Sequence, residues 1–175
     1  MSKSTRAPKP AATDQTLKTI SSLAEIKADT IIKIIPTADL QFYLYAYAPT
    51  GEQIFITSHS TPPPRSLWTL HLQVVGESAF YHIRSYPDSH LYMTYVASQE
   101  KVFLRTYSGN DDQKWLFLIA DVADGRGIFN ICNIVQDKSY LSVRLPLTNG
   151  SPILTKYDFS DFTQRFILQS EGETP

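Results

Sequence analysis

Residues 113–133 read QKWLFLIADVADGRGIFNICN and contain two stretches in which large apolar side chains occupy alternate positions. Trp115, Phe117 and Ile119 mark the first stretch, and Phe129 and Ile131 mark the second. A period of two residues places such side chains on one face of a β-strand. The stretch therefore predicts two successive strands, each of which buries one face.

The pattern around Phe129 recurs at intervals of roughly 50 residues, the period of a repeat architecture. Its three copies are Ile32-Lys33-Ile34, Tyr81-His82-Ile83 and Phe129-Asn130-Ile131. Each copy is followed, near the end of its repeat, by a tripeptide that finishes in an aromatic residue: Ser66-Leu67-Trp68, Gln113-Lys114-Trp115 and Gln164-Arg165-Phe166. Three equivalent units in one chain predict a fold with internal threefold pseudosymmetry.

Two further short apolar stretches lie inside each repeat, and Gly, Pro, Asn and Asp residues separate them. Each repeat therefore reads as four short strands, and none of the three units can bury a face alone. Closing the strands into a barrel capped by hairpins removes the sheet edges and creates one core. We expect Trp68, Trp115 and Phe166 to pack near the pseudo-threefold axis, because large aromatic side chains dominate protein cores.

The tripeptide Gln113-Lys114-Trp115 is a QxW motif, and Gln164-Arg165-Phe166 is a weakened copy of it. Together with Phe129 to Asn133 and the following Tyr140-Leu141-Ser142-Val143, these residues resemble the ricin-type β-trefoil lectin family over about residues 30–170. The resemblance implies an all-β fold, a β-trefoil of three four-stranded repeats. It also implies structural core roles for Trp68, Gln113, Trp115, Gln164 and Phe166, and a non-catalytic carbohydrate-binding function for the protein.

The family's sugar site, as the resemblance implies it, combines a carboxylate, a stacking aromatic ring and an Asn before the QxW glutamine. This sequence departs from the pattern, since Tyr45, Tyr92 and Ser142 stand at the carboxylate position. The stacking position falls near Ser58, Arg105 and Lys156, and the residue before each QxW position is Arg65, Asp112 or Thr163. The remaining candidate site is in the second repeat, where aromatic rings and polar groups occur together: Tyr92, Tyr107, Asn110 and Asp112.

An alternative function rests on the segment Pro62-Pro63-Pro64-Arg65, between the third and fourth predicted strands. Three prolines favour an extended, pre-ordered chain, which lowers the entropy cost of docking into a groove. The loop suits a β-trefoil protease inhibitor, similar in plan to the fungal mycocypins. Loss of the lectin carboxylates favours the inhibitor and the retained QxW motif favours the lectin, so a glycan and a protease both stay open as partners.

Composition argues against several other classes of protein. The formal net charge is -1, so the whole-domain basic footprint of a nucleic-acid-binding protein is absent. The single cysteine, Cys132, and the spacing of the four His residues predict no metal site, and we expect no cofactor and no enzymatic activity. The apolar runs are too short for membrane insertion, and no secretory signal is evident, which leads us to expect a cytoplasmic protein.

The ends of the chain differ in composition from its middle. Residues 1–12 are rich in Ser, Thr, Pro, Ala and basic residues, which predicts a flexible tail. We assign residues 1–28 to a basic N-terminal tail that includes a short amphipathic helix, with Leu17, Ile20, Leu23 and Ala24 on one stripe. Residues 29–170 form the predicted β-trefoil domain, and residues 171–175 form a short C-terminal tail.

Overall fold

The computed structural model describes residues 18–27, 30–46, 53–58, 66–87, 90–135, 139–147 and 152–170. The first repeat contains β2 (Ile31–Pro36), β3 (Tyr43–Ala46), β4 (Ile54–Thr57) and β5 (Leu67–Val75). The second contains β6 (Ser78–Tyr86), β7 (Leu91–Val96), β8 (Lys101–Thr106) and β9 (Trp115–Ala123), and the third contains β10 (Arg126–Asn133), β11 (Ser139–Ser142), β12 (Ile153–Lys156) and β13 (Phe166–Ser170). A short strand, β1 (Lys18–Thr19), precedes them. Single 3-10 turns lie at η1 (Leu23–Glu25), η2 (Ala97–Gln99), η3 (Asp111–Gln113) and η4 (Phe162–Gln164).

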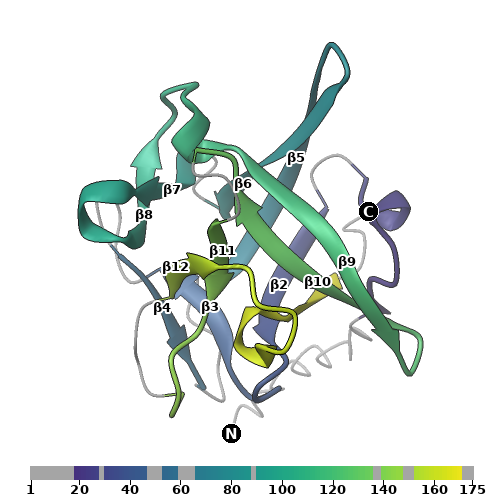
Figure 1. Ribbon diagram of the computed structural model, residues 1–175. Helices are drawn as coiled ribbons and strands as arrows, with labels where there is room; N and C mark the ends of the chain where they lie inside the picture. Colours follow the sequence, from purple (N-terminus) through teal and green to yellow (C-terminus); the bar gives the residue numbers. More distant parts are fainter. Residues whose placement is uncertain are drawn as a thin grey trace, which may run out of the picture.

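The first and fourth strands of the three repeats close into a six-stranded antiparallel barrel (Figure 1). Within a repeat, β2 pairs with β5, β6 with β9 and β10 with β13. Between repeats, β5 pairs with β6, β9 with β10 and β13 with β2, so the ring has no open edge. The second and third strands form the hairpins β3–β4, β7–β8 and β11–β12. The prediction of three four-stranded repeats, an all-β β-trefoil, is confirmed.

Each repeat places one fully buried aromatic side chain on its fourth strand, namely Trp68, Trp115 or Phe166. The indole N–H of Trp68 donates to the carbonyl of Leu44 at 3.2 Å, and that of Trp115 donates to the carbonyl of Met93 at 2.9 Å. These bonds tie the barrel to the second strand of the same repeat and satisfy a buried indole donor. The phenyl ring of Phe166 has no N–H group, so the third repeat packs its aromatic ring without this hydrogen bond.

The packed structure includes residues that precede the domain boundary expected at residue 29. Strand β1 pairs with β13, and the Ile20 N–H donates to the Leu168 carbonyl at 3.0 Å. In turn, the Ile20 carbonyl accepts a 3.1 Å hydrogen bond from Gly127, and the Ile20 side chain is only 2 % exposed. Gly127 allows this close approach because a Cβ atom there would lie 2.7 Å from the Ser21 carbonyl oxygen.

The helix expected between residues 13 and 28 is represented, over the described residues 18–27, by one 3-10 turn at Leu23–Glu25. Strand pairing at Lys18–Thr19 and the burial of Ile20 fix this segment as extended chain before the turn. Backbone partners on β13 and β10 therefore override the helical spacing of its apolar residues. Residues 1–17 and 171–175 lie outside the described residues.

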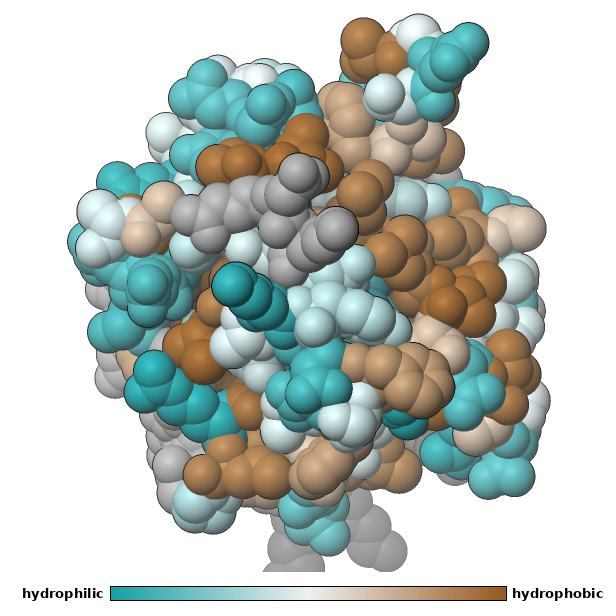
Figure 2. Space-filling view, viewed as in Figure 1, coloured by the Kyte–Doolittle hydropathy of each residue, from teal (hydrophilic) through white to brown (hydrophobic). Residues whose placement is uncertain are grey.

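Two long hairpins, β5–β6 and β9–β10, extend from the body of the molecule (Figure 1). Figure 2 shows hydrophobic surface over β9 and near the tip of the β5–β6 hairpin. The large exposed apolar residues are Leu72, Val74 and Val75 on β5, and Leu118, Ile119 and Val122 on β9. The expectation that Ile119 shares the buried face of Trp115 and Phe117 is therefore wrong, and a shift in the β9–β10 register lies opposite this position. The exposure arises because both hairpins continue beyond the part of the barrel that buries Trp68 and Trp115.

Candidate functional site

A buried glutamine holds the turn that carries the candidate site in the second repeat. The Gln113 side-chain oxygen accepts a 2.8 Å hydrogen bond from the Ser108 backbone N–H. Its nitrogen donates to the Thr106 carbonyl and to the Thr94 hydroxyl, both at 2.9 Å. Gln113 therefore holds one backbone group on each side of Tyr107, the Thr106 carbonyl and the Ser108 N–H. Because Gln113 is fully buried, water does not compete for these bonds.

Three aromatic rings meet at this turn. The ring centroids of Tyr92 and Tyr107 lie 5.0 Å apart, and His82 lies 5.8 Å from Tyr92 and 5.3 Å from Tyr107 in edge-on contacts. Tyr107 is 57 % exposed, Tyr92 is half-buried and His82 is buried. The arrangement is an exposed tyrosine ring backed by two further rings, and such contacts stabilise aromatic clusters beyond the area that they bury.

His82 is held in its neutral form at the base of the ring cluster. Burial lowers the pKa of His82, and the nearby cationic or titratable groups of His71, Lys114 and Arg84 lower it further. The Nε2 atom of His82 is buried and makes no hydrogen bond with the described residues. A neutral imidazole packs beside the tyrosine rings without the desolvation cost of a buried charge.

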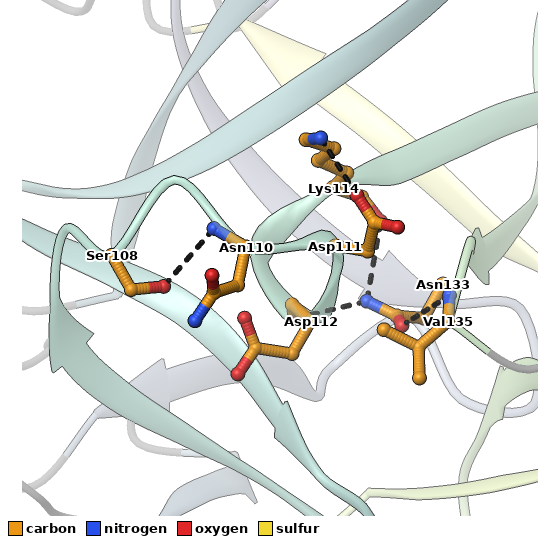
Figure 3. Close-up of polar contacts among 7 residues, drawn as sticks. All are labelled: Ser108, Asn110, Asp111, Asp112, Lys114, Asn133 and Val135. Atoms are coloured by element: carbon orange, nitrogen blue, oxygen red, sulfur yellow. Dashed lines mark hydrogen bonds and ion pairs between the residues drawn. The ribbon is translucent and has the colours of Figure 1, made fainter.

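Asn110 and Asp112 supply polar groups on the turn that follows Tyr107 in the chain. The Asn110 N–H donates to the Ser108 hydroxyl at 3.3 Å, and the Asn110 side chain is exposed. Figure 3 shows the side chains of Asn110 and Asp112 on the same side of the turn η3, whereas Asp111 points toward Lys114. The Oδ1 atom of Asp112 is buried without a hydrogen-bond partner among the described residues, so it is an acceptor left unused.

Asn133 anchors the turn to the third repeat. Its side-chain nitrogen donates to the carbonyl of Asp112 at 3.1 Å and to that of Lys114 at 3.2 Å (Figure 3). Its side-chain oxygen accepts a 3.1 Å bond from the Val135 N–H. Asn133 therefore fixes the backbone of the turn on either side of Gln113, at Asp112 and at Lys114.

An ion pair that sequence reasoning did not identify borders the aromatic cluster. Lys114 lies 2.7 Å from Asp111, and its Nζ atom also lies 4.9 Å from the centroid of the Phe80 ring. The centroids of the Phe80 and His82 rings lie 5.4 Å apart, in an edge-on arrangement. The 2.7 Å pair connects residues three apart across a turn, a spacing that could have indicated it. The contact with Phe80 required the tertiary structure, because it joins the first strand of the second repeat to the residue that precedes its fourth strand.

Strand pairing corrects the alignment of the repeats. Leu44 pairs with Ile56, Met93 with Leu104 and Leu141 with Leu154, so these three pairs are equivalent. Tyr92 consequently matches Tyr43 and Tyr140, and the residue that matches Tyr45 and Ser142 is Thr94 rather than Tyr92. The difference arises because the repeats have loops of unequal length between their first and second strands.

Pro62, Pro63, Pro64 and Arg65, the alternative inhibitory loop, lie outside the described residues. Across the part of the chain that the structure describes, no three His, Cys, Asp or Glu side chains gather as metal ligands would. Over the same part, no helix has the length and apolar composition needed to cross a bilayer.

Comparison with solved structures gives the class of fold. The protein is similar to the BEL beta-trefoil in its apo crystal form, with a TM-score of 0.67 and 16 % identity over 83 % of this chain and 97 % of that chain. It is also similar to the Polyporus squamosus lectin bound to the human-type influenza-binding epitope Neu5Acα2-6Galβ1-4GlcNAc, with a TM-score of 0.66 and 18 % identity over 82 % of this chain. A third match is a mosquitocidal holotoxin, with a TM-score of 0.67 and 13 % identity over 83 % of this chain. The protein is a β-trefoil.

The likeness extends to the fold and not to sequence. The chain spans 50 % of the Polyporus squamosus lectin chain and 17 % of the holotoxin chain. No protein-family model matches the sequence. No curated protein matches it either.

Proposed function

We propose that this β-trefoil is a non-catalytic carbohydrate-binding protein, and that the second repeat carries a sugar site. The observation that carries the proposal is the exposed ring of Tyr107, which contacts the rings of Tyr92 and His82. Gln113 holds the backbone on both sides of Tyr107, through the Thr106 carbonyl and the Ser108 N–H. A ring that is ordered before binding costs little entropy when a ligand stacks on it.

The polar groups around the ring suit a sugar. A pyranose offers one apolar face and several hydroxyl groups at its edge. Tyr107 would contact the apolar face, while the exposed amide of Asn110 and the carboxylate of the partly exposed Asp112 would bind hydroxyls. Hydrogen bonds to a charged acceptor are the stronger kind, so Asp112 would contribute most to orientation.

The fold-level comparison supports the same class of partner. The Polyporus squamosus lectin, of similar fold, is described as bound to a sialylated trisaccharide. Similarity of fold alone is an associational argument, so the proposal depends on the geometry around Tyr107.

A glycan array tests the proposal, with wild type, Tyr107→Ala, Tyr107→Phe and Leu40→Ala compared on the same slides. We expect retention of the wild type to fall steeply in Tyr107→Ala, to persist in Tyr107→Phe, which keeps the ring, and to be unchanged in Leu40→Ala, a substitution of another exposed apolar side chain. Tyr92→Ala should also weaken retention, since it removes the support of the ring. Melting curves of all variants establish that they fold.

The outcome also decides between this function and the alternative. A wild-type protein that is retained by no glycan and inhibits a papain-type or aspartic protease would replace the lectin proposal with the inhibitor. Substitution of Pro62 to Arg65 would then be the next experiment, because the inhibitor hypothesis assigns the contact to that segment.

A further inference from the structure

A titratable side chain, His82, lies at the base of the proposed sugar site. Its ring centroid lies 5.3 Å from that of Tyr107 and 5.8 Å from that of Tyr92, and the two contacts are edge-on. His82 is only 4 % exposed, whereas Tyr107, which would contact the sugar, is 57 % exposed. The charge state of a buried imidazole therefore acts directly on the ring that the ligand would touch.

The charged and titratable groups that flank His82 on its neighbouring strands are basic. His71 stands directly opposite it on β5. Lys114 precedes β9, which pairs with β6 next to this position, and Arg84 follows on the same face of β6. Burial, and after it the proximity of these three groups, lowers the pKa of His82. The carboxylate of Asp111 is already paired with Lys114, at 2.7 Å.

A proton on His82 would place a positive charge where little compensates it. The Nε2 atom of His82 is buried and has no hydrogen-bond partner among the described residues. A buried charge needs a partner or water, so protonation favours an arrangement in which water reaches the imidazole. Displacing the exposed ring of Tyr107 admits that water. Because Gln113 holds the backbone on both sides of Tyr107, the change is confined to side chains.

The third repeat contains a similar turn with a second tyrosine pair. The ring centroids of Tyr140 and Tyr157 lie 4.7 Å apart. The side-chain oxygen of Gln164 accepts a 3.1 Å hydrogen bond from the Asp158 N–H, as that of Gln113 does from Ser108. The two repeats therefore build the same kind of turn beside a pair of rings.

The residue under the rings differs between these repeats. The third repeat has Asn130 at the position of His82, and its amide donates to the Gln164 carbonyl at 2.8 Å. An amide does not titrate, and it satisfies its hydrogen bonds within the repeat. The fold itself therefore does not require a titratable group at this position, and His82 gives the second repeat a sensitivity to pH that Asn130 does not give the third.

We infer that the sugar site of the second repeat is controlled by pH: it binds its glycan while His82 is neutral and releases it in mildly acidic solution, when a proton on His82 displaces the ring of Tyr107. The inference rests on the proposed function of this repeat. The proton comes from solvent, and no covalent bond of the ligand changes. Proton and glycan select different states of one side-chain cluster, so a bound glycan must also make His82 harder to protonate.

The size of the effect follows from the fraction of molecules in the binding state. A glycan that binds only the neutral state has an apparent Kd equal to its intrinsic Kd divided by the neutral fraction. The affinity is therefore constant well above the native pKa of His82 and falls about tenfold for each pH unit below it. Since burial lowers this pKa from its ordinary value of 6.5, the decrease lies below pH 6.5.

The test measures the affinity of the full chain for the oligosaccharide that retains the wild type most strongly on the array, from pH 7.5 to pH 5.0. This range stays above the ordinary pKa of aspartate, about 3.9. Wild type is compared with His82→Asn, His82→Gln and, as the matched control, His71→Asn. We expect wild type and His71→Asn to lose affinity below pH 6.5 and both His82 variants to keep their own pH 7.5 value. Circular dichroism at each pH establishes that every protein stays folded.

Nuclear magnetic resonance of the wild-type His82 ring provides a second measurement that needs no variant. We expect the midpoint of its titration to move to lower pH when the same oligosaccharide is present at saturation. If both His82 variants fail to fold, this measurement decides the inference.

Three results overturn the inference and leave the proposed function standing. They are a wild-type affinity that is equal at pH 7.5 and pH 5.0, a loss of affinity that persists in both His82 variants, and a His82 titration that the glycan does not move. A wild type that binds no glycan at pH 7.5 overturns the proposed function, and the inference with it.

Discussion

The side-chain oxygen of Gln113 accepts a 2.8 Å hydrogen bond from the backbone N–H of Ser108. Through its nitrogen, the same amide also holds the carbonyl of Thr106. One buried side chain therefore fixes both neighbours of Tyr107, and a residue that contributes to the core also determines the position of an exposed ring.

Replacing Gln113 with Ala should destabilise the protein and release the turn that carries Tyr107. Each buried backbone group left without a partner costs about 1–3 kcal/mol. Chemical denaturation measures the stability, and amide hydrogen exchange measures the local effect. We expect protection of the Ser108 N–H to be lost. Gln164→Ala is the matched control, because it should expose the Asp158 N–H to exchange and leave Ser108 protected. Equal protection of the Ser108 N–H in both variants would show that Gln113 does not hold this turn.

Replacing Trp115 with Ala should cost about 3–5 kcal/mol, because a fully buried indole leaves a large cavity. Trp115→Phe tests the contribution of the indole N–H, since the third repeat already accommodates Phe166 at the equivalent position. Trp115→Phe loses the bond to the Met93 carbonyl but keeps a buried ring, so it should lower the free energy of unfolding by less than Trp115→Ala does. Denaturant melts check both values, and a loss below roughly 1 kcal/mol in Trp115→Ala would show that the aromatic ring is not central to the core.

Ile20 should be as important to stability as a residue of the barrel strands. Its side chain is buried and its backbone bonds to both Leu168 and Gly127, so Ile20→Ala should cost about 2–5 kcal/mol. Deletion of residues 1–12, which contain few side chains able to contribute to a core, should leave the melting temperature nearly unchanged. A large drop on that deletion, or an Ile20→Ala variant as stable as wild type, would contradict this division of the N-terminal region.

His82 should make stability depend on pH below neutrality. Burial lowers the pKa of His82 from its ordinary value of 6.5. The unfolded chain therefore binds a proton below about pH 6.5 that the native protein does not, and stability falls as the pH decreases from there toward the native pKa. We expect a lower melting temperature at pH 5.5 than at pH 7.5. The difference should shrink in His82→Asn, which copies Asn130 of the third repeat.

Thermal melts of both proteins across this pH range provide the check. Asn130 donates to the Gln164 carbonyl at 2.8 Å, so an amide at the equivalent position has a precedent in the same fold. An identical pH dependence in wild type and His82→Asn would assign the titration to another group.

The fold could be predicted from the sequence because its repeats are encoded locally. Alternation at Trp115, Phe117 and Phe129 specifies which face of each strand is buried, and the near-equal spacing of the three copies specifies the symmetry. From the sequence, Tyr92 and Tyr107 could be predicted to belong to the same repeat but not to be in contact. Their contact depends on the register of β7 against β8, which loop lengths conceal in the sequence.

By itself, the sequence determined the strand pattern, the threefold repetition and the buried aromatic residues, because each depends on residue type and short-range spacing. The tertiary structure alone decided which side chains meet. It placed His82 under two tyrosines, brought Ile20 against β13 and matched Tyr140 and Tyr157 to the pair in the second repeat. The tyrosine contacts join strands of one repeat, and Ile20 joins a segment at the start of the chain to the last strand. The register of these strands depends on loop lengths and backbone hydrogen bonds, which the spacing of residue types in the sequence does not specify.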